Sequence, residues 1–227
     1  MIKLMKQICT KIVSRSNFMI FSRSETEFAT RLTLEGNTLD RVEETKLVGV
    51  WLTTWVDWDK NTRETCKKAY ARLTMLTKLK YVGVPKEDLI HIYILYVRSL
   101  LEYCSTVWHS TLTVEQSNNL ERVQKLCLKI ILGEDYHGYD DALEKCGLER
   151  LTLRREAKCL NFGLKSLLHP IHSEMFPVNP QVLTNPDSRI GEHFVVNHAK
   201  RDSYRDSAVP YIQRMLNEYV KQQKKTR

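Results

Sequence analysis

The chain has 227 residues, with 35 lysines and arginines against 27 aspartates and glutamates, and a formal net charge of +8. A hydrophobic fraction of 42% is that of a globular protein and excludes general disorder, and the length suits one large domain or two small ones. The six cysteines form no Cys-x-x-Cys pair and no signal peptide is recognised, so we expect reduced thiols in an intracellular protein. A pI near 9.1 favours an anionic partner, nucleic acid first and an anionic membrane surface second.

The N-terminal quarter predicts short strands. Residues 1–16 form a basic segment without a clear pattern, and from 17 to 58 strands are predicted over 18–21, 31–34 and 46–53. Gly36-Asn37 lies between alternating apolar positions and supplies the positive φ angles that a tight hairpin turn requires. We therefore expect a small antiparallel β hairpin or sheet ahead of the helices.

Helical periodicity extends from residue 59 to residue 169. The first predicted helix, over 59–80, has one apolar stripe, made of Cys66, Tyr70, Leu73 and Leu76. The next helix has Pro85 in its predicted first turn and is apolar on nearly all sides, so we expect it to be the central, most buried one. Because this stretch also contains His91, Arg98 and Glu102, we predict no membrane span.

A third helix is predicted over 113–132 with clear signals at both ends. Thr113 and Gln116 have the spacing of a capping box, and Gly133 is a suitable terminator. Its predicted core face consists of Leu120, Val123, Cys127, Ile130 and Ile131.

The rest of the chain predicts two further helices, an irregular stretch and a terminal helix. The two helices are expected over 140–146, before Gly147, and over 152–168, before Pro170. Repeated prolines after residue 170 favour an irregular wrap, and a C-terminal helix from 207 ends in a basic run. The predicted fold class is mainly α: a helical bundle preceded by a small β hairpin or sheet.

No enzyme motif is recognised, and we assign no catalytic residue. His169 and His172 would be metal ligands with Cys159, but the proline between them and the lack of a second pair favour surface histidines. Asp140 and Asp141 follow a tyrosine, as in the metal-binding turn of polymerases. Since a helical pattern continues after them, we interpret them as a helix start. We predict no metal site and no cofactor.

Basic residues follow two of the predicted helices at steps of three and four. The helix over 59–80 has seven basic residues against two acidic ones, a local charge of +5 (7 − 2). A single basic stripe is more often a solvated face, but two stripes on one bundle favour a surface that follows a phosphate backbone. The predicted nucleic-acid-binding residues are Lys60, Arg63, Lys67, Arg72, Arg122, Lys125 and Lys129.

Two more arginines, Arg154 and Arg155, open a predicted helix, where positive charge opposes the helix dipole. Either an anion balances them or they are solvated, and the sequence leaves both interpretations open. We include both arginines among the nucleic-acid-binding candidates.

Several blocks of the chain have the spacing of a known family. The longest spans 82–133 and includes Arg98-Ser99, Glu102-Tyr103, Trp108 and Val123-Gln124; others lie at 17–22, 47–52, 142–155 and 204–217. In these blocks the chain resembles the C-terminal part of reverse transcriptases encoded by jockey-like non-LTR retrotransposons. The resemblance covers residues 17–217, nearly the whole chain.

The resemblance implies a palm end over 17–58, a thumb-like bundle over 59–169 and a C-terminal region over 170–227. It implies a primer-grip-like hairpin, made of Leu47, Val48, Gly49, Val50 and Trp51. The implied partner is an RNA and DNA primer-template, bound independently of sequence. The family's catalytic aspartates would precede residue 17, where nothing resembles them, so we expect no polymerase activity of this chain alone. Mg would be expected only in an intact polymerase.

A second hypothesis is a helical protein-interaction module, or a nonfunctional remnant, with no nucleic-acid role. Trp51, Trp55 and Trp58 lie within eight positions, and if exposed they would drive self-association or recruit a protein partner. A third hypothesis is that a longer reading frame supplies the catalytic palm.

Overall fold

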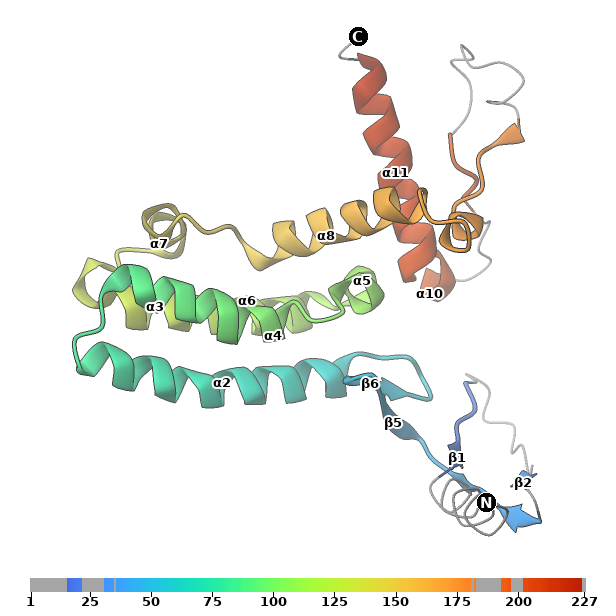
Figure 1. Ribbon diagram of the computed structural model, residues 1–227, viewed down its shortest axis with the longest axis horizontal. Coiled ribbons are helices and arrows are strands. Elements are labelled where there is room, and N and C mark those ends of the chain that lie inside the picture. The colour runs from blue at the N-terminus through green and yellow to red at the C-terminus, as the bar shows by residue number, and fades with distance from the viewer. Residues whose placement is uncertain are drawn as a thin grey trace, which may run out of the picture. The chain divides into compact units, whose positions relative to one another are not determined.

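The computed structural model describes residues 16–21, 31–34, 36–180, 182, 193–196 and 202–225. The chain divides into two units, residues 1–61 and 62–227. It is mainly helical, with short strands ahead of the helices and a helix at the C-terminal end (Figure 1). The predicted fold class is therefore confirmed. The predictions for residues 1–15 and for Pro186 lie outside the described residues.

The described strands of the first unit form three two-stranded sheets. Strand β1 (Asn17–Phe18) pairs in parallel with β4 (Asp40–Arg41), and β2 (Thr33–Leu34) pairs antiparallel with β3 (Asn37–Thr38). Strands β5 (Glu44–Leu47) and β6 (Val50–Thr53) form the longest hairpin. The predicted antiparallel hairpins are confirmed. The single strand predicted over 46–53 is wrong, because the chain turns in its middle, and the parallel pair was not predicted.

Both hairpin turns use left-handed backbone conformations. Gly36 has a φ of +79° and precedes Asn37, which already pairs with Leu34, so the turn lies one residue earlier than predicted. At the tip of the second hairpin, Val48 and Gly49 have φ angles of +46° and +88°. Two such residues in succession match the backbone twist of the flanking strands. A β-branched valine is strained in this conformation.

Replacing Val48 with asparagine is therefore expected to stabilise the β5–β6 hairpin by about 1 kcal/mol, because asparagine tolerates the left-handed region and Asn-Gly is the preferred turn pair. Hydrogen–deuterium exchange of the hairpin amides in the full chain measures this as slower exchange. The control is Leu47→Asn, which places the same residue in the strand itself, where it gives no such gain. Unchanged or faster exchange of the hairpin amides in Val48→Asn would show that Val48 is not strained in the parent chain.

Helix α2 (Asp59–Tyr81) confirms the helix predicted over 59–80. Its buried apolar side chains are Cys66, Ala69, Leu73 and Leu76, at steps of three and four. Tyr70, which was predicted for this stripe, is 38% exposed. The prediction for Tyr70 is wrong because its neighbour Ala69 faces the core instead.

The chain reverses at Pro85 and continues as α3 (Lys86–Ile92), the π-helical segment η1 (Tyr93–Arg98) and α4 (Ser99–Leu101). Pro85 is the residue before the helix, one position earlier than the first-turn place predicted for it. The buried face consists of Leu89, Tyr93, Val97 and Leu101. Leu95 and Tyr96 are 68% and 53% exposed, so the apolar residues of this stretch are buried on one face and not all around the helix.

A short segment, α5 (Ser105–Trp108) with η2 (His109–Thr111), leads into α6 (Val114–Leu132). The predicted capping box is confirmed: the Gln116 amide donates to Thr113 Oγ1 at 3.1 Å, and the Thr113 amide donates to Gln116 Oε1 at 3.0 Å. Gly133 ends the helix with a φ of +62°. The predicted core face is buried, apart from Ile130, which is partly exposed.

After the turn η3 (Gly133–Asp135), α7 (Tyr139–Cys146) and α8 (Leu151–Ser166) confirm the next two predicted helices. Gly147 ends α7 in the left-handed conformation, as predicted. Helix α7 packs on α6 through one cluster of buried residues, namely Leu128, Leu132, Ala142, Leu143 and Cys146.

The C-terminal region contains η4 (His172–Met175), α10 (Asp202–Arg205) and α11 (Ala208–Lys225), which crosses α8 (Figure 1). Its core cluster is formed by Cys159, Phe176, Phe194, Ile212 and Leu216. The buried amide of Asn217 accepts from the Phe194 N–H at 2.7 Å and donates to the Phe194 carbonyl at 3.0 Å. This pair of bonds attaches the segment 193–196 to α11. None of the described helices is long and apolar enough to cross a membrane.

Candidate nucleic-acid interface

Helices α2 and α6 lie side by side in the second unit. Near their C-terminal ends, Lys80 Nζ donates to the Ile131 carbonyl at 2.7 Å. Further back, Arg122 of α6 lies close enough to Tyr70 of α2 for its positive charge to act on the Tyr70 phenol. Burial and then Cys66 raise the pKa of this phenol, and Arg122 lowers it in part. Because residue 70 is matched with 122 and residue 80 with 131, the two helices run parallel.

The outer faces of these helices present two rows of exposed cations. We call them the α2–α6 cationic surface: Arg63, Lys67 and Lys78 from α2, and Arg122, Lys125 and Lys129 from α6. Arg63 and Lys78, at the two ends of the α2 row, are 15 positions apart, or about 22 Å along the helix axis. Sequence reasoning did not assign Lys78 to the row. Its distance of 11 residues from Lys67, close to three helical turns, is the signal that would have found it.

Two tyrosines lie beneath the α6 row. Lys125 Nζ is 4.9 Å from the ring centroid of Tyr139, and Lys129 Nζ is 5.4 Å from that of Tyr136. The guanidinium of Arg150 lies 5.3 Å from the ring of Tyr139 as well. Cation–π attraction holds these charges in place. With cations over its tyrosine rings, the surface presents charge for phosphate contacts and leaves less ring face for stacking on bases.

A buried hydrogen-bond network positions Tyr139. Gln124, which is fully buried, accepts from the Tyr93 hydroxyl and donates to the Tyr139 hydroxyl at 2.8 Å and to the Glu149 carbonyl at 2.9 Å. The Tyr139 hydroxyl donates to Glu121 Oε1 at 2.6 Å. Burial, followed by Glu121, raises the pKa of Tyr139, so the hydroxyl keeps the proton that it donates.

Glu121 connects this network to α8. Its Oε1 atom also accepts from the backbone N–H of Leu151, the first residue of α8, at 3.2 Å. The first N–H groups of a helix have no partner within the helix, and a carboxylate there also interacts favourably with the helix dipole. The network therefore joins η1, α6, α7 and α8 behind the cationic surface.

Lys60 and Arg72, two other predicted cations, are engaged within the protein. In the first unit, Lys60 pairs with Glu44 and its Nζ lies 4.1 Å from the ring centroid of Trp51. In the second unit, the guanidinium of Arg72 donates to the carbonyl oxygen of Tyr96 in the π-helical segment. Neither charge belongs to the two exposed rows.

The placement of Arg154 and Arg155 corrects their assignment to the interface. Arg154 Nε donates to Glu102 Oε1 at 2.6 Å, and Lys158 Nζ lies 2.7 Å from the other oxygen of this buried carboxylate. Of the two interpretations, an anion is therefore right for Arg154, and that anion belongs to the chain itself.

Arg155 has no exposed surface. It donates through Nη2 to Ser117 Oγ at 3.0 Å and through Nε to His109 Nδ1 at 3.3 Å. This side chain is therefore neither exposed to solvent nor accessible to a phosphate backbone. The prediction that Arg155 binds nucleic acid is wrong, because its side chain is fully buried where α5 packs on α8 and is hydrogen-bonded to His109 of η2.

The primer-grip-like residues lie on the β5–β6 hairpin. Leu47 and Val48 are 60% and 76% exposed at its tip, whereas Val50 is buried. The Trp51 amide donates to Asn61 Oδ1 at 3.2 Å, and the ring of Trp51 lies under Lys60. The primer-grip role stays a prediction. Trp58 is buried and Trp55 is 51% exposed, so the three tryptophans do not form one exposed cluster.

The residues that resembled metal ligands have other roles. The exposed rings of His169 and His172 stack with centroids 4.3 Å apart, while Cys159 is buried in the α8–α11 cluster. Asp140 and Asp141 lie in the first turn of α7 and pair with Arg150 and Lys145, which confirms the helix-start interpretation. Within the described ranges, no group of histidine, cysteine, aspartate and glutamate side chains has the arrangement of a metal site.

Comparison with protein-family models, with curated proteins and with solved structures gave no match. The resemblance to reverse transcriptases of non-LTR retrotransposons therefore rests on the residues of this chain alone.

Proposed function

We propose that the chain is a retrotransposon-derived reverse-transcriptase fragment that binds an RNA/DNA primer-template through the α2–α6 cationic surface, without polymerase activity of its own. One observation supports this above all: two parallel helices with six exposed cations in two rows on their outer faces. The proposal leaves out Arg154 and Arg155, whose charges are used within the bundle, and leaves Lys60 and Arg72 in structural roles.

Phosphate contacts explain how such a surface binds. Each phosphate that a lysine or arginine neutralises releases condensed counterions, so affinity depends steeply on salt and little on sequence. If all six cations contact phosphates, affinity falls by roughly 10³-fold between 50 and 200 mM salt. The neighbouring tyrosine rings lie under Lys125 and Lys129, so in this proposal they hold the charges in position and do not read the bases.

The test is a titration of the full chain with labelled RNA/DNA primer-template at two salt concentrations. The triple variant Arg63→Glu, Lys67→Glu and Arg122→Glu is expected to weaken binding at least about tenfold at low salt, since three contacts become repulsive. Primer-templates of unrelated sequence should all lose affinity for this variant by the same factor. The slope of log affinity against log salt should fall by about 3.

The matched control is the triple variant Lys221→Glu, Lys224→Glu and Lys225→Glu on α11. Each triple changes the net charge by −6, from +8 to +2. The control therefore separates a local surface from overall charge. Equal loss of affinity in the two variants, or full affinity in the α2–α6 variant, would refute the proposed interface.

A further inference from the structure

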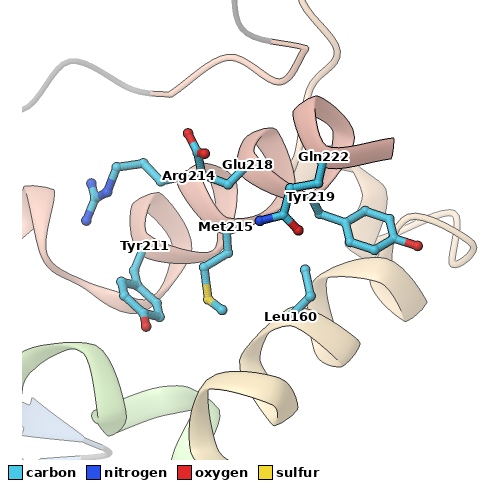
Figure 2. A pocket seen from close by; sticks show the side chains of 7 residues that line it. All are labelled: Leu160, Tyr211, Arg214, Met215, Glu218, Tyr219 and Gln222. Carbon is cyan, nitrogen blue, oxygen red and sulfur yellow. The ribbon is translucent and has the colours of Figure 1, made fainter. Parts of the chain in front are cut away.

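A groove of about 280 Å³ lies between α8 and α11, and none of the residues that line it belongs to the α2–α6 cationic surface (Figure 2). Leu160 of α8 and Met215 of α11 point toward each other across its floor, and the rings of Tyr211 and Tyr219 lie at its two ends. Arg214 and Glu218 lie on the rim. The floor is thus apolar, with an aromatic ring at each end and charged groups above.

The groove follows from how the two helices meet. A Cβ atom on Gly163 would lie 2.6 Å from Ile212 Cγ2 and 3.2 Å from Leu216 Cδ1, so α8 and α11 approach closely at this glycine. Because the helices cross, they separate on moving away from that contact (Figure 1). Leu160 and Met215 pack against the core cluster but stay only partly buried, which leaves apolar surface in the groove.

The size and lining fit side chains of a docked helix better than a small molecule. Pockets for drug-sized ligands enclose about 300–1,000 Å³, and this groove is smaller and open. One or two apolar side chains of an amphipathic helix fill such a space, as in helix-in-groove recognition. The flexible thioether of Met215 adapts to the shape of the inserted side chain.

The charge along α11 favours a partner of negative charge. From residue 214 to 225 the helix has Arg214, Lys221, Lys224 and Lys225 against Glu218, a net charge of +3 (4 − 1). Both charged residues on the rim pair within the chain, Glu218 with Lys221 at 2.9 Å and Arg214 with Asp206 at 3.6 Å, so the excess positive charge lies at Lys224 and Lys225. Complementary charge across an interface favours association with an acidic partner.

We infer that the α8–α11 groove is a docking site for an acidic amphipathic helix of another protein. The partner inserts one or two apolar side chains between Tyr211 and Tyr219, and its acidic residues face the basic end of α11. This interaction is separate from the proposed nucleic-acid binding and uses none of the same residues.

The probe is a labelled synthetic helix with leucines on one face and glutamates on the other, titrated against the full chain. Saturable binding is expected, weakened roughly tenfold by Lys221→Glu, Lys224→Glu and Lys225→Glu, since long-range attraction turns into repulsion. Met215→Gln, which makes the floor polar at similar length, should weaken it roughly fivefold. The Arg63→Glu, Lys67→Glu and Arg122→Glu variant should bind the peptide as the parent does.

Three results would overturn this inference. Equal binding of a peptide with the same composition in scrambled order would show that charge alone is sufficient for binding. Equal weakening by the α2–α6 variant would assign the effect to net charge. Binding of nucleic acid at the α11 lysines, with no binding of the peptide, would make this end of the chain part of a nucleic-acid site. Since each triple variant serves as the control for the other, the two proposals fail separately.

Discussion

Replacing Gln124 with methionine is expected to lower the free energy of unfolding by about 3 kcal/mol, although the two side chains are similar in size. The amide joins the fully buried Tyr93 hydroxyl, the Tyr139 hydroxyl and the Glu149 carbonyl. Methionine leaves the Tyr93 hydroxyl and the Glu149 carbonyl without this partner, and a buried polar group without a partner costs about 1–3 kcal/mol. Urea unfolding at neutral pH measures the loss.

The control is the same exchange at Gln223, which is exposed on α11 and should change stability by less than about 0.5 kcal/mol. Adding Tyr93→Phe to Gln124→Met should recover part of the loss, because both partners of one hydrogen bond are then removed together. A single Gln124→Met variant as stable as the parent would show that the network contributes nothing to stability.

Acid is expected to destabilise the protein as the pH falls from about 6.5 to about 4, through His109. Burial, and then the charge of Arg155, lower the pKa of His109 from 6.5 to about 4. Between these values the unfolded chain binds a proton that the folded chain excludes, so stability is full above this window and is lost as the pH falls through it. The loss reaches up to about 3 kcal/mol.

The contacts of His109 also predict that protonation destabilises the folded chain. His109 Nδ1 accepts a hydrogen bond from Arg155 Nε at 3.3 Å, and a protonated imidazole cannot accept it. The His109 ring also packs edge-on against Tyr211 of α11, with centroids 5.9 Å apart. Protonation therefore places two cations together at the contact between η2, α8 and α11.

The variant that isolates this effect is His109→Gln, whose amide oxygen accepts the same hydrogen bond without titrating. Thermal unfolding between pH 6.5 and 5 should show a flatter dependence on pH in the variant than in the parent. Parent-like pH dependence in His109→Gln would exclude His109 as the source.

Glu102 acts in a lower pH range. Burial alone would raise its pKa, but hydrogen bonds from Arg154 and Lys158 outweigh burial and hold the pKa below its usual value of 4.5. Its contribution is therefore present above that value and is lost only below it, outside the range used for His109.

Features that depend on neighbours in sequence were predictable. The Thr113–Gln116 capping box joins residues three apart, and Gly133 and Gly147 end their helices through their own φ angles. The hairpin turn was misplaced by one residue because Gly36 and Asn37 both tolerate positive φ, and cross-strand pairing of Asn37 with Leu34 decides between them. Such local signals place element boundaries well.

Features that depend on distant residues were not predictable. Arg155 is buried by His109 and Ser117, which lie 46 and 38 positions away. The segment 89–101 is apolar on nearly all sides, so its pattern gives little information on which face is covered. Leu95 and Tyr96 stay exposed because no described element packs over that face.

The sequence by itself determined the spacing of the cations along α2 and along α6, because backbone hydrogen bonds within a helix set which side chains share a face. Only the tertiary structure decided that the two helices run parallel, and that Arg154 and Arg155 pair within the bundle. It also decided that α8 and α11 meet at Gly163 and leave a groove beside that contact. The physical reason is that burial and pairing depend on contacts between residues far apart in the chain, which helical periodicity does not encode.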